Sequence, residues 1–331
     1  MTQPSQCNPI VRHRVSNSQK NGTGARLGLG LAALGRPAYI TVGRGDDLGE
    51  SADRSVDAMR ARAHTVLDAA WQQGIRYVDA ARSYGLAEQF LGSWLAGHPE
   101  RRAELTLGSK WGYEYIGEWQ MNAQTHERKE HSLRMLERQW PESLAALGGP
   151  PDVYLIHSLT TDSPALGDDA LLERLRQIAA GGVRVGFSTS GPGQATVIDA
   201  ALALPGSPFS AVQTTWNLRE PSAGPALARA KDAGWLVVVK EVLANGRLTL
   251  RGGEPDALAL AERAAQPLAG LAIGAAFAQP WPDIVLTGAV TAEQLRENLA
   301  ARLPRVSADD LASLAEPPAE YWAARSARAW S

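Results

Sequence analysis

The sequence predicts a (β/α)8 TIM barrel with a C-terminal helical extension. Eight short apolar segments, each typical of a β-strand, follow one another from about residue 26, with room for a helix between successive strands. Several of the intervening segments place their apolar residues on one helical face. Eight β–α units in one chain favour a closed parallel barrel. A doubly wound open sheet remains the alternative, because strand count alone does not exclude it.

The predicted strands are, in chain order, 26–34 (RLGLGLAAL), 74–80 (GIRYVDA), 104–110 (ELTLGSK), 152–158 (DVYLIHS), 183–189 (VRVGFST), 210–217 (SAVQTTWN), 234–242 (GWLVVVKEV) and 283–289 (DIVLTGA). Helical periodicity is clear between Ala61 and Gln73 and again over residues 169–181. Gly74 and Gly234 directly precede strands, as glycines that end helices do. The Ala-rich pattern after Pro304 predicts further helix, which we expect to close over one end of the barrel.

Length and composition predict one barrel domain over residues 25–331, preceded by a flexible arm at 1–24. Apolar residues make up 44% of the 331 residues and charged residues 21%, as in ordinary globular domains. The formal net charge of −2 implies no nucleic-acid partner, and no apolar run reaches the roughly 18 residues that suggest a membrane span. The single cysteine, Cys7, and the lack of a signal-peptide pattern favour a cytoplasmic location. Oligomeric state is not indicated.

Four polar residues stand at the ends of three neighbouring predicted strands. Asp79 and Tyr84 follow the second strand, Lys110 ends the third and His157 ends the fourth. In a barrel, the carboxyl ends of the strands meet at one mouth, so these side chains are expected to converge. A tyrosine with an ordinary pKa of about 10 becomes a better acid beside a lysine ammonium, which a carboxylate can hold in place. The set therefore predicts a proton-donating site in which the histidine orients a polar substrate.

Two other patterns were weighed and set aside. Residues 23–30 (TGARLGLG) match a dinucleotide-binding glycine motif, but no buried strand precedes them and Pro37 follows closely. His126 and His131 are five residues apart, not the four that align two zinc ligands on a helix, and we interpret them as solvent-facing helix residues. No metal site is predicted. Four aromatic residues at the presumed mouth are candidates for a substrate wall: Trp111, Tyr113, Trp119 and Trp216.

From about Leu27 to Asn298, the sequence resembles the aldo/keto reductase superfamily. The segment DAARSY resembles the D-x4-Y signature of that family, GSKWG its lysine strand and LIHS its histidine strand. The resemblance implies a (β/α)8 barrel and a catalytic tetrad of Asp79, Tyr84, Lys110 and His157.

The resemblance also implies a nicotinamide cofactor. GFSTS and VQTTWN resemble the segments that hold the nicotinamide carboxamide, KEVLANGRL the loop around the pyrophosphate, and VLTGAVTAEQLREN the adenosine-binding segment. Lys240 stands where many members have an aromatic residue that stacks on the nicotinamide, and Gly288 and Gln294 stand where many have a lysine and an arginine at the 2′-phosphate. The implied cofactor contacts are Ser188, Thr189, Gln213, Lys240, Glu241, Val242, Leu243, Asn245, Gly246, Arg247, Gly288, Gln294, Glu297 and Asn298. The pattern is similar to that of potassium-channel β subunits and related bacterial members, so we favour NADPH, with NADH as the alternative.

Together these features predict an NADP-dependent aldo/keto reductase. It would interconvert an aldehyde or ketone and an alcohol by hydride transfer, with Tyr84 as general acid and base. One alternative is a regulatory or sensor protein of the channel β-subunit type, against which His157 speaks, because those proteins typically lack the tetrad histidine. A barrel lyase or epimerase is the other. The expected partner is a small carbonyl or alcohol substrate, whose identity the sequence does not give.

Overall fold

The computed structural model describes residues 24–42, 44–49 and 51–330, so the predicted arm at 1–24, with Cys7, lies almost entirely outside the described residues. Eight parallel strands close into a barrel in the order β1-β10-β9-β8-β7-β6-β3-β2. They are β1 (Arg26–Gly30), β2 (Tyr77–Asp79), β3 (Thr106–Trp111), β6 (Val153–Leu159), β7 (Arg184–Thr189), β8 (Ala211–Thr215), β9 (Leu236–Lys240) and β10 (Ile284–Thr287). The predicted barrel is confirmed, and each of the eight predicted strands overlaps an observed one, although the first ends at Gly30 and not at residue 34.

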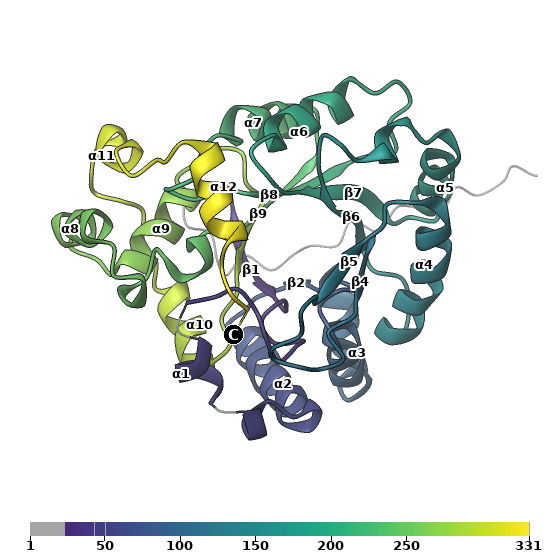
Figure 1. Ribbon diagram of the computed structural model, residues 1–331, viewed down its shortest axis with the longest axis horizontal. Coiled ribbons are helices and arrows are strands. Elements are labelled where there is room, and N and C mark those ends of the chain that lie inside the picture. Colours follow the sequence, from purple (N-terminus) through teal and green to yellow (C-terminus); the bar gives the residue numbers. More distant parts are fainter. Residues whose placement is uncertain (1–23, 43, 50, 331) are drawn as a thin grey trace, which may run out of the picture.

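Helices surround the barrel as an outer ring (Figure 1). They are α1 (Arg44–Leu48), α2 (Val56–Gln72), α3 (Ala87–Ala96), α4 (Leu133–Leu147), α5 (Asp169–Ala180), α6 (Gln194–Ala203), α7 (Gly224–Asp232), α8 (Pro255–Arg263), α9 (Leu268–Phe277), α10 (Ala292–Leu299), α11 (Ala308–Ala312) and α12 (Pro318–Ser326). Short 3-10 turns occupy Ser51–Arg54, Pro99–Glu104, Pro164–Gly167, Ala244–Gly246 and Leu250–Gly252. Gly74 and Gly234 adopt φ of 80° and 81° after α2 and α7, which explains why glycine ends these helices.

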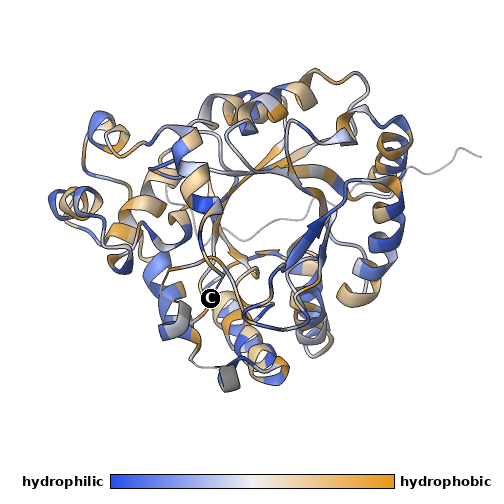
Figure 2. Ribbon diagram, in the orientation of Figure 1, coloured by the Kyte–Doolittle hydropathy of each residue, from blue (hydrophilic) through white to orange (hydrophobic). Residues whose placement is uncertain are grey.

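Two apolar clusters divide the strand residues by face. The larger cluster joins the outward face of the strands to the helices, several of which turn hydrophilic residues outward (Figure 2), whereas α9 is buried along nearly all of its length. The smaller cluster alternates with it along the same strands and therefore fills the barrel interior. Its members are Tyr77, Val153, Leu155, Ala211, Val238, Ile284 and Leu286. We call this set the interior plug.

A hairpin that the sequence did not predict lies between β3 and α4. It pairs β4 (Tyr113–Tyr115) with β5 (Glu127–Lys129) in antiparallel register. In Figure 1 it lies at the rim of the ring, as does α12. The expectation that His126 and His131 are solvent-facing helix residues is wrong, because His126 directly precedes β5, His131 precedes α4, and both side chains are buried.

Candidate functional site

The four residues of the predicted tetrad come together at the mouth. Lys110 Nζ lies 2.5 Å from Asp79 Oδ2 and donates a second hydrogen bond to Ala80 O at 2.8 Å. The same nitrogen is 4.5 Å from the centroid of the Tyr84 ring. The rings of Tyr84 and His157 meet edge to face, with centroids 5.4 Å apart. Direct contacts therefore join the four side chains into one cluster.

A cavity of about 1650 Å³ opens at this group. Asp79, Tyr84 and His157 line it, and Lys110 lies behind them, fully buried. The cavity runs from the tetrad past the loop after β9 to the beginning of α10. Its size and elongated lining suit a dinucleotide together with a small substrate.

Burial governs the protonation of the tetrad. Burial and the Asp79 carboxylate raise the pKa of Tyr84 well above its usual value, while Arg36 lowers it. Burial lowers the pKa of Lys110, and the Asp79 carboxylate opposes this shift. The pKa of His157 is also far below its ordinary value, because burial and the nearby Lys110 charge disfavour the imidazolium. The neutral histidine has one ring N–H to donate, and Ser83 Oγ lies 3.2 Å from its Nδ1.

Near the tetrad, the side-chain amide of Gln213 is arranged as expected of a residue that contacts the carboxamide of a nicotinamide. Its Nε2 donates to Asp79 Oδ1 at 2.8 Å, and its buried Oε1 has no partner among the described residues. Ser188 and Thr189 are buried but do not line the cavity. Ser188 Oγ accepts the Ser158 N–H at 2.7 Å, and Thr189 Oγ1 donates to Gln194 Oε1 at 3.2 Å. The neighbouring Ser190, which the sequence analysis did not select, lines the cavity instead.

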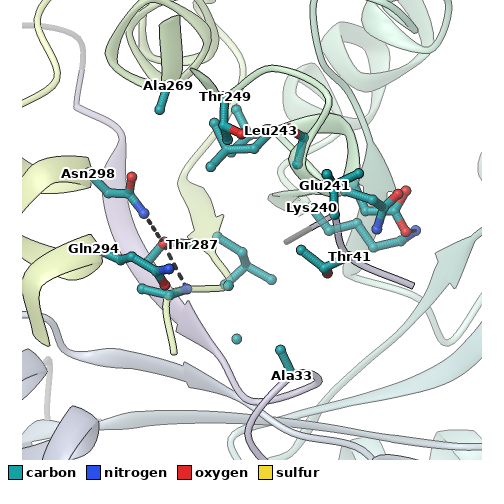
Figure 3. A pocket seen from close by; sticks show the side chains of 18 of the residues that line it. Ala33, Thr41, Lys240, Glu241, Leu243, Thr249, Ala269, Thr287, Gln294 and Asn298 are labelled. Carbon is teal, nitrogen blue, oxygen red and sulfur yellow. Dashed lines mark hydrogen bonds and ion pairs between the residues drawn. The ribbon is translucent and has the colours of Figure 1, made fainter. Parts of the chain in front are cut away.

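Lys240 and Glu241 line the cavity at the end of β9 (Figure 3). Lys240 Nζ donates to Thr215 Oγ1 at 2.8 Å. Burial lowers the pKa of this lysine to about 8, although Glu241 opposes the shift. Glu241 is buried too, which raises its pKa, but the ion pair with Arg325 of α12 and the Lys240 charge bring it down to about 2. At this position the cavity wall carries the cationic side chain of Lys240, whereas an aromatic residue that stacks on a ligand would be uncharged.

The loop after β9 contributes Val242, Leu243, Asn245 and Gly246 to the lining. Asn245 and Gly246 have φ of 54° and 95°, a left-handed conformation that turns the backbone around the cavity. The predicted contact Arg247 is not in the lining, because it pairs with Glu254 and Glu316 on the outer side.

Across the cavity lies a segment that sequence reasoning missed, residues 39–42 between β1 and α1. The Val42 N–H donates to Asn245 O at 3.0 Å, so this segment meets the loop after β9. The only available signal was its position after the carboxyl end of the first strand.

At the far end, Gly288, Gln294, Glu297 and Asn298 line the cavity. Asn298 Nδ2 donates to Thr287 Oγ1 at 2.6 Å, and Gln294 Oε1 accepts the Val290 N–H at 2.9 Å (Figure 3). Arg251, also in the lining, pairs with Asp47 at 2.7 Å. Acidic and basic side chains are therefore both present at this end.

Of the four predicted wall aromatics, only Tyr113 lines the cavity. Trp111 follows Lys110 directly, so it points to the opposite face of β3, where it is fully buried beside His131. Trp119 packs edge to face on Phe90, and its Nε1 donates to Arg54 O at 2.8 Å. Trp216 packs against Trp281. We therefore withdraw these three tryptophans as substrate contacts.

Two aromatic residues that were not predicted, Tyr39 and Trp330, line the cavity instead. Trp330 comes from the segment after α12 and stacks on His126, with ring centroids 4.2 Å apart and an angle of 11°. The extension thus reaches the mouth, as expected from the sequence. No local sequence pattern identifies Trp330 as a lining residue, because its stacking partner His126 lies some two hundred residues earlier in the chain.

Among the described residues, no group of three or more histidine, cysteine, aspartate or glutamate side chains is arranged to hold a metal ion. Within the same residues, we find no helix with the length and apolar character needed to cross a membrane. A dinucleotide, by contrast, fits the lining, because the unpartnered oxygens Gln213 Oε1 and Asn245 Oδ1 are buried acceptors on residues of its wall.

Comparison with known proteins agrees with this geometry. The family model for the aldo/keto reductase family matches residues 26–317. No curated protein matches the sequence. The holo form of the aldo-keto reductase AKR11C1 from Bacillus halodurans has a TM-score of 0.66 and 23% identity, over 88% of this chain and 92% of that chain.

Two further solved structures share the fold. A protein from Pseudomonas aeruginosa described as an aldo-keto reductase has a TM-score of 0.59 and 21% identity, over 83% of this chain and 88% of that one. A protein described as a 2,5-diketo-D-gluconic acid reductase B has a TM-score of 0.60 and 22% identity, over 78% of this chain and 85% of its own. At these identities, the likeness shows a common fold.

Proposed function

Because the chain belongs to the aldo/keto reductase family of oxidoreductases, we propose that it is a nicotinamide-dependent reductase that interconverts an aldehyde or ketone with its alcohol. The observation that carries the proposal is the buried Lys110–Asp79 pair at 2.5 Å beside the Tyr84 ring, at the wall of a large cavity. In this proposal the Tyr84 phenol is the proton donor, and the neutral His157 imidazole, whose ring meets that of Tyr84, is a second hydrogen-bond donor.

Each tetrad residue has a role that follows from its surroundings. The raised pKa keeps the Tyr84 phenol protonated, so it can give its proton to the carbonyl oxygen as negative charge develops there. Lys110, fixed by Asp79, holds a positive charge beside the phenolate that remains. If Ser83 donates to Nδ1 of His157, the Nε2–H of that histidine is left to hydrogen-bond the carbonyl oxygen. When bound, the reduced nicotinamide supplies the hydride.

The nucleotide would lie along the cavity from the tetrad to α10. We propose Gln213 and Ser190 for the carboxamide end, residues 242–246 for the pyrophosphate, and Gln294 and Asn298 for the adenosine. The cavity-lining residues Gly288 and Gln294 provide no cation for a 2′-phosphate, and Gln294 Oε1 is engaged by the Val290 N–H. We favour NADPH on the family resemblance and retain NADH as the alternative, so both must be titrated.

The deciding experiment compares Tyr84→Phe with Tyr154→Phe. Tyr154 is also buried but does not line the cavity, and its hydroxyl makes one long contact of 3.5 Å with Ser143. On a panel of aldehydes and ketones, followed by nicotinamide absorbance, we expect Tyr84→Phe to lose on the order of a hundredfold or more in turnover. Nucleotide affinity, measured by fluorescence, should stay within a few-fold in both variants.

The outcomes separate the possible functions. Full turnover in Tyr84→Phe would show that Tyr84 is not the proton donor. Tight nucleotide binding without turnover on any substrate would favour a nucleotide sensor. Absence of binding by either nucleotide would favour a barrel enzyme with other chemistry.

A further inference from the structure

Arg36, in the loop between β1 and α1, is buried beside the proposed proton donor. Its side chain is 2% exposed. The guanidinium carbon lies 5.2 Å from the centroid of the Tyr84 ring, and its Nη1 donates to Ser83 O at 3.1 Å and to Glu127 Oε1 at 2.7 Å. The same carbon is 4.8 Å from the Tyr39 ring centroid and 4.6 Å from that of Trp330. A permanently charged, planar group therefore contacts the ring of Tyr84 and the backbone directly before it.

We propose that Arg36 is a positioning residue for Tyr84: it holds the phenol ring toward Lys110 and places a second cation next to it. This inference rests on the proposed role of Tyr84. Lys110 Nζ approaches the ring to 4.5 Å and Arg36 Cζ to 5.2 Å, both within the range of cation–π attraction, which is strongest where water is excluded. The bond to Ser83 O fixes the turn that carries Tyr84, so charge and position come from one side chain.

The titratable and charged groups that face Tyr84 come from every side of the mouth. They are Asp79 of β2, Lys110 of β3, the neutral His157 of β6, Arg36 and the neutral Tyr39 after β1, Glu127 of β5, and Glu241 after β9. Burial is the main cause of the raised Tyr84 pKa and Asp79 adds to it; Arg36 lowers the pKa, whereas Glu127 raises it. The two members of the Arg36–Glu127 ion pair therefore act on Tyr84 in opposite directions.

This opposition gives a test with a predicted sign. 3-Fluorotyrosine, whose phenol is more acidic than that of tyrosine, is placed at position 84 and titrated by 19F NMR in the nucleotide-free full-length protein. Arg36→Gln should move the midpoint to higher pH and Glu127→Gln to lower pH, while Arg36→Lys should stay closer to the parent than Arg36→Gln does. Alcohol oxidation by the unfluorinated protein gives a second test, because this direction of the reaction needs the Tyr84 phenolate. At a pH below the midpoint of the Tyr84 titration, its rate should fall by roughly tenfold in Arg36→Gln and rise in Glu127→Gln.

A purely structural role for Arg36 predicts another result. The midpoint would then stay unchanged, or move in the same direction in Arg36→Gln and Glu127→Gln, and either result would overturn the inference. If Arg36→Gln does not fold, Glu127→Gln still decides, because only the loss of its negative charge predicts a lower midpoint. The NMR titration needs no turnover, so opposite shifts in an inactive protein would refute the proposed function and leave the Arg36–Tyr84 coupling intact.

Discussion

Lys240 gives the cavity wall at the end of β9 a charge that depends on pH. Its pKa is lowered to about 8 by burial, so the side chain is protonated below about pH 8 and neutral above it. An oxidised nicotinamide ring carries a positive charge and a reduced one does not. A protonated Lys240 should therefore disfavour the oxidised nucleotide, if the ring binds beside it as the family resemblance implies.

The expected result is a redox preference that weakens as pH rises. The ratio of the dissociation constants of oxidised and reduced nucleotide should fall through about pH 8, as Lys240 loses its proton. In Lys240→Met the ratio should be smaller and nearly independent of pH in that range. Fluorescence titration measures both constants, with Lys231→Met as control, because Lys231 pairs with Asp283 away from the cavity lining. The same pH slope in Lys240→Met would contradict the assignment.

At the scale of single elements, α12 is attached to the mouth by buried polar contacts. Arg325 pairs with Glu241 through both carboxylate oxygens, and Asn217 Nδ2 donates to Tyr321 Oη at 3.0 Å. Glu241 is 8% exposed, so removal of Arg325 would leave its carboxylate buried without its main partner. Such a loss typically costs about 3–5 kcal/mol.

Arg325→Met should therefore release α12 more than it weakens the barrel. We expect faster amide hydrogen exchange over residues 318–326 and a lower unfolding midpoint. The pKa of Glu241 should rise from about 2 in the variant. In the parent, the ion pair contributes stability that is fully present above the unfolded-state pKa of Glu241 and is lost as pH falls toward 2, and the variant should lack this contribution. Arg263→Met is the control, because its pair with Asp310 is exposed to solvent and should contribute little to stability. Equal effects of the two substitutions would argue against a docked α12.

At the scale of the whole molecule, the interior plug predicts where the barrel is least tolerant of added volume. A Cβ at Gly28 would lie 2.8 Å from Ile284 Cγ2 and 2.9 Å from Leu286 Cδ2, two members of the plug. Gly28→Ala should lower the free energy of unfolding by about 1–3 kcal/mol. Denaturant unfolding measures the loss, and turnover per folded molecule should be retained. Gly167→Ala, where nothing lies within 4 Å of the new Cβ, should change neither quantity; equal destabilisation by both would rule out overpacking as the cause.

The sequence was sufficient for the features that depend on repeated local patterns. Each strand is a short apolar run, several are preceded by a glycine that ends a helix, and the barrel follows from eight such units. The tetrad could be predicted because strand ends of a parallel barrel meet at one mouth. These arguments need only the position of a residue along its strand.

Features that depend on distant partners could not be predicted, whereas the direction of the Trp111 side chain follows from the alternation along its strand and was predicted wrongly. Trp111 was expected in the cavity, but it is one residue beyond Lys110 and faces the other side of β3. Arg247 was expected to meet an anion, but Glu254 and Glu316 neutralise it from later in the chain. Trp330 reaches His126 only because α12 folds back over the mouth. Periodicity carries no information about such long-range contacts.

The interior plug also bears on how this barrel can change over generations. Its members stand lower on the strands than the polar residues of the mouth, as Tyr77 does relative to Asp79, and they hold the barrel closed without contributing a polar group to the site. Loops at the mouth can therefore be exchanged with little effect on closure. In a saturation library of single substitutions, the effect of a substitution should depend on its position along the barrel axis. Substitutions in the interior plug should reduce the yield of folded protein. Changes at residues 39–42, in the β4–β5 hairpin or at Trp330 should alter which carbonyl compounds are accepted. The fold thus allows the range of accepted substrates to change while the interior plug, which holds the barrel closed, stays the same.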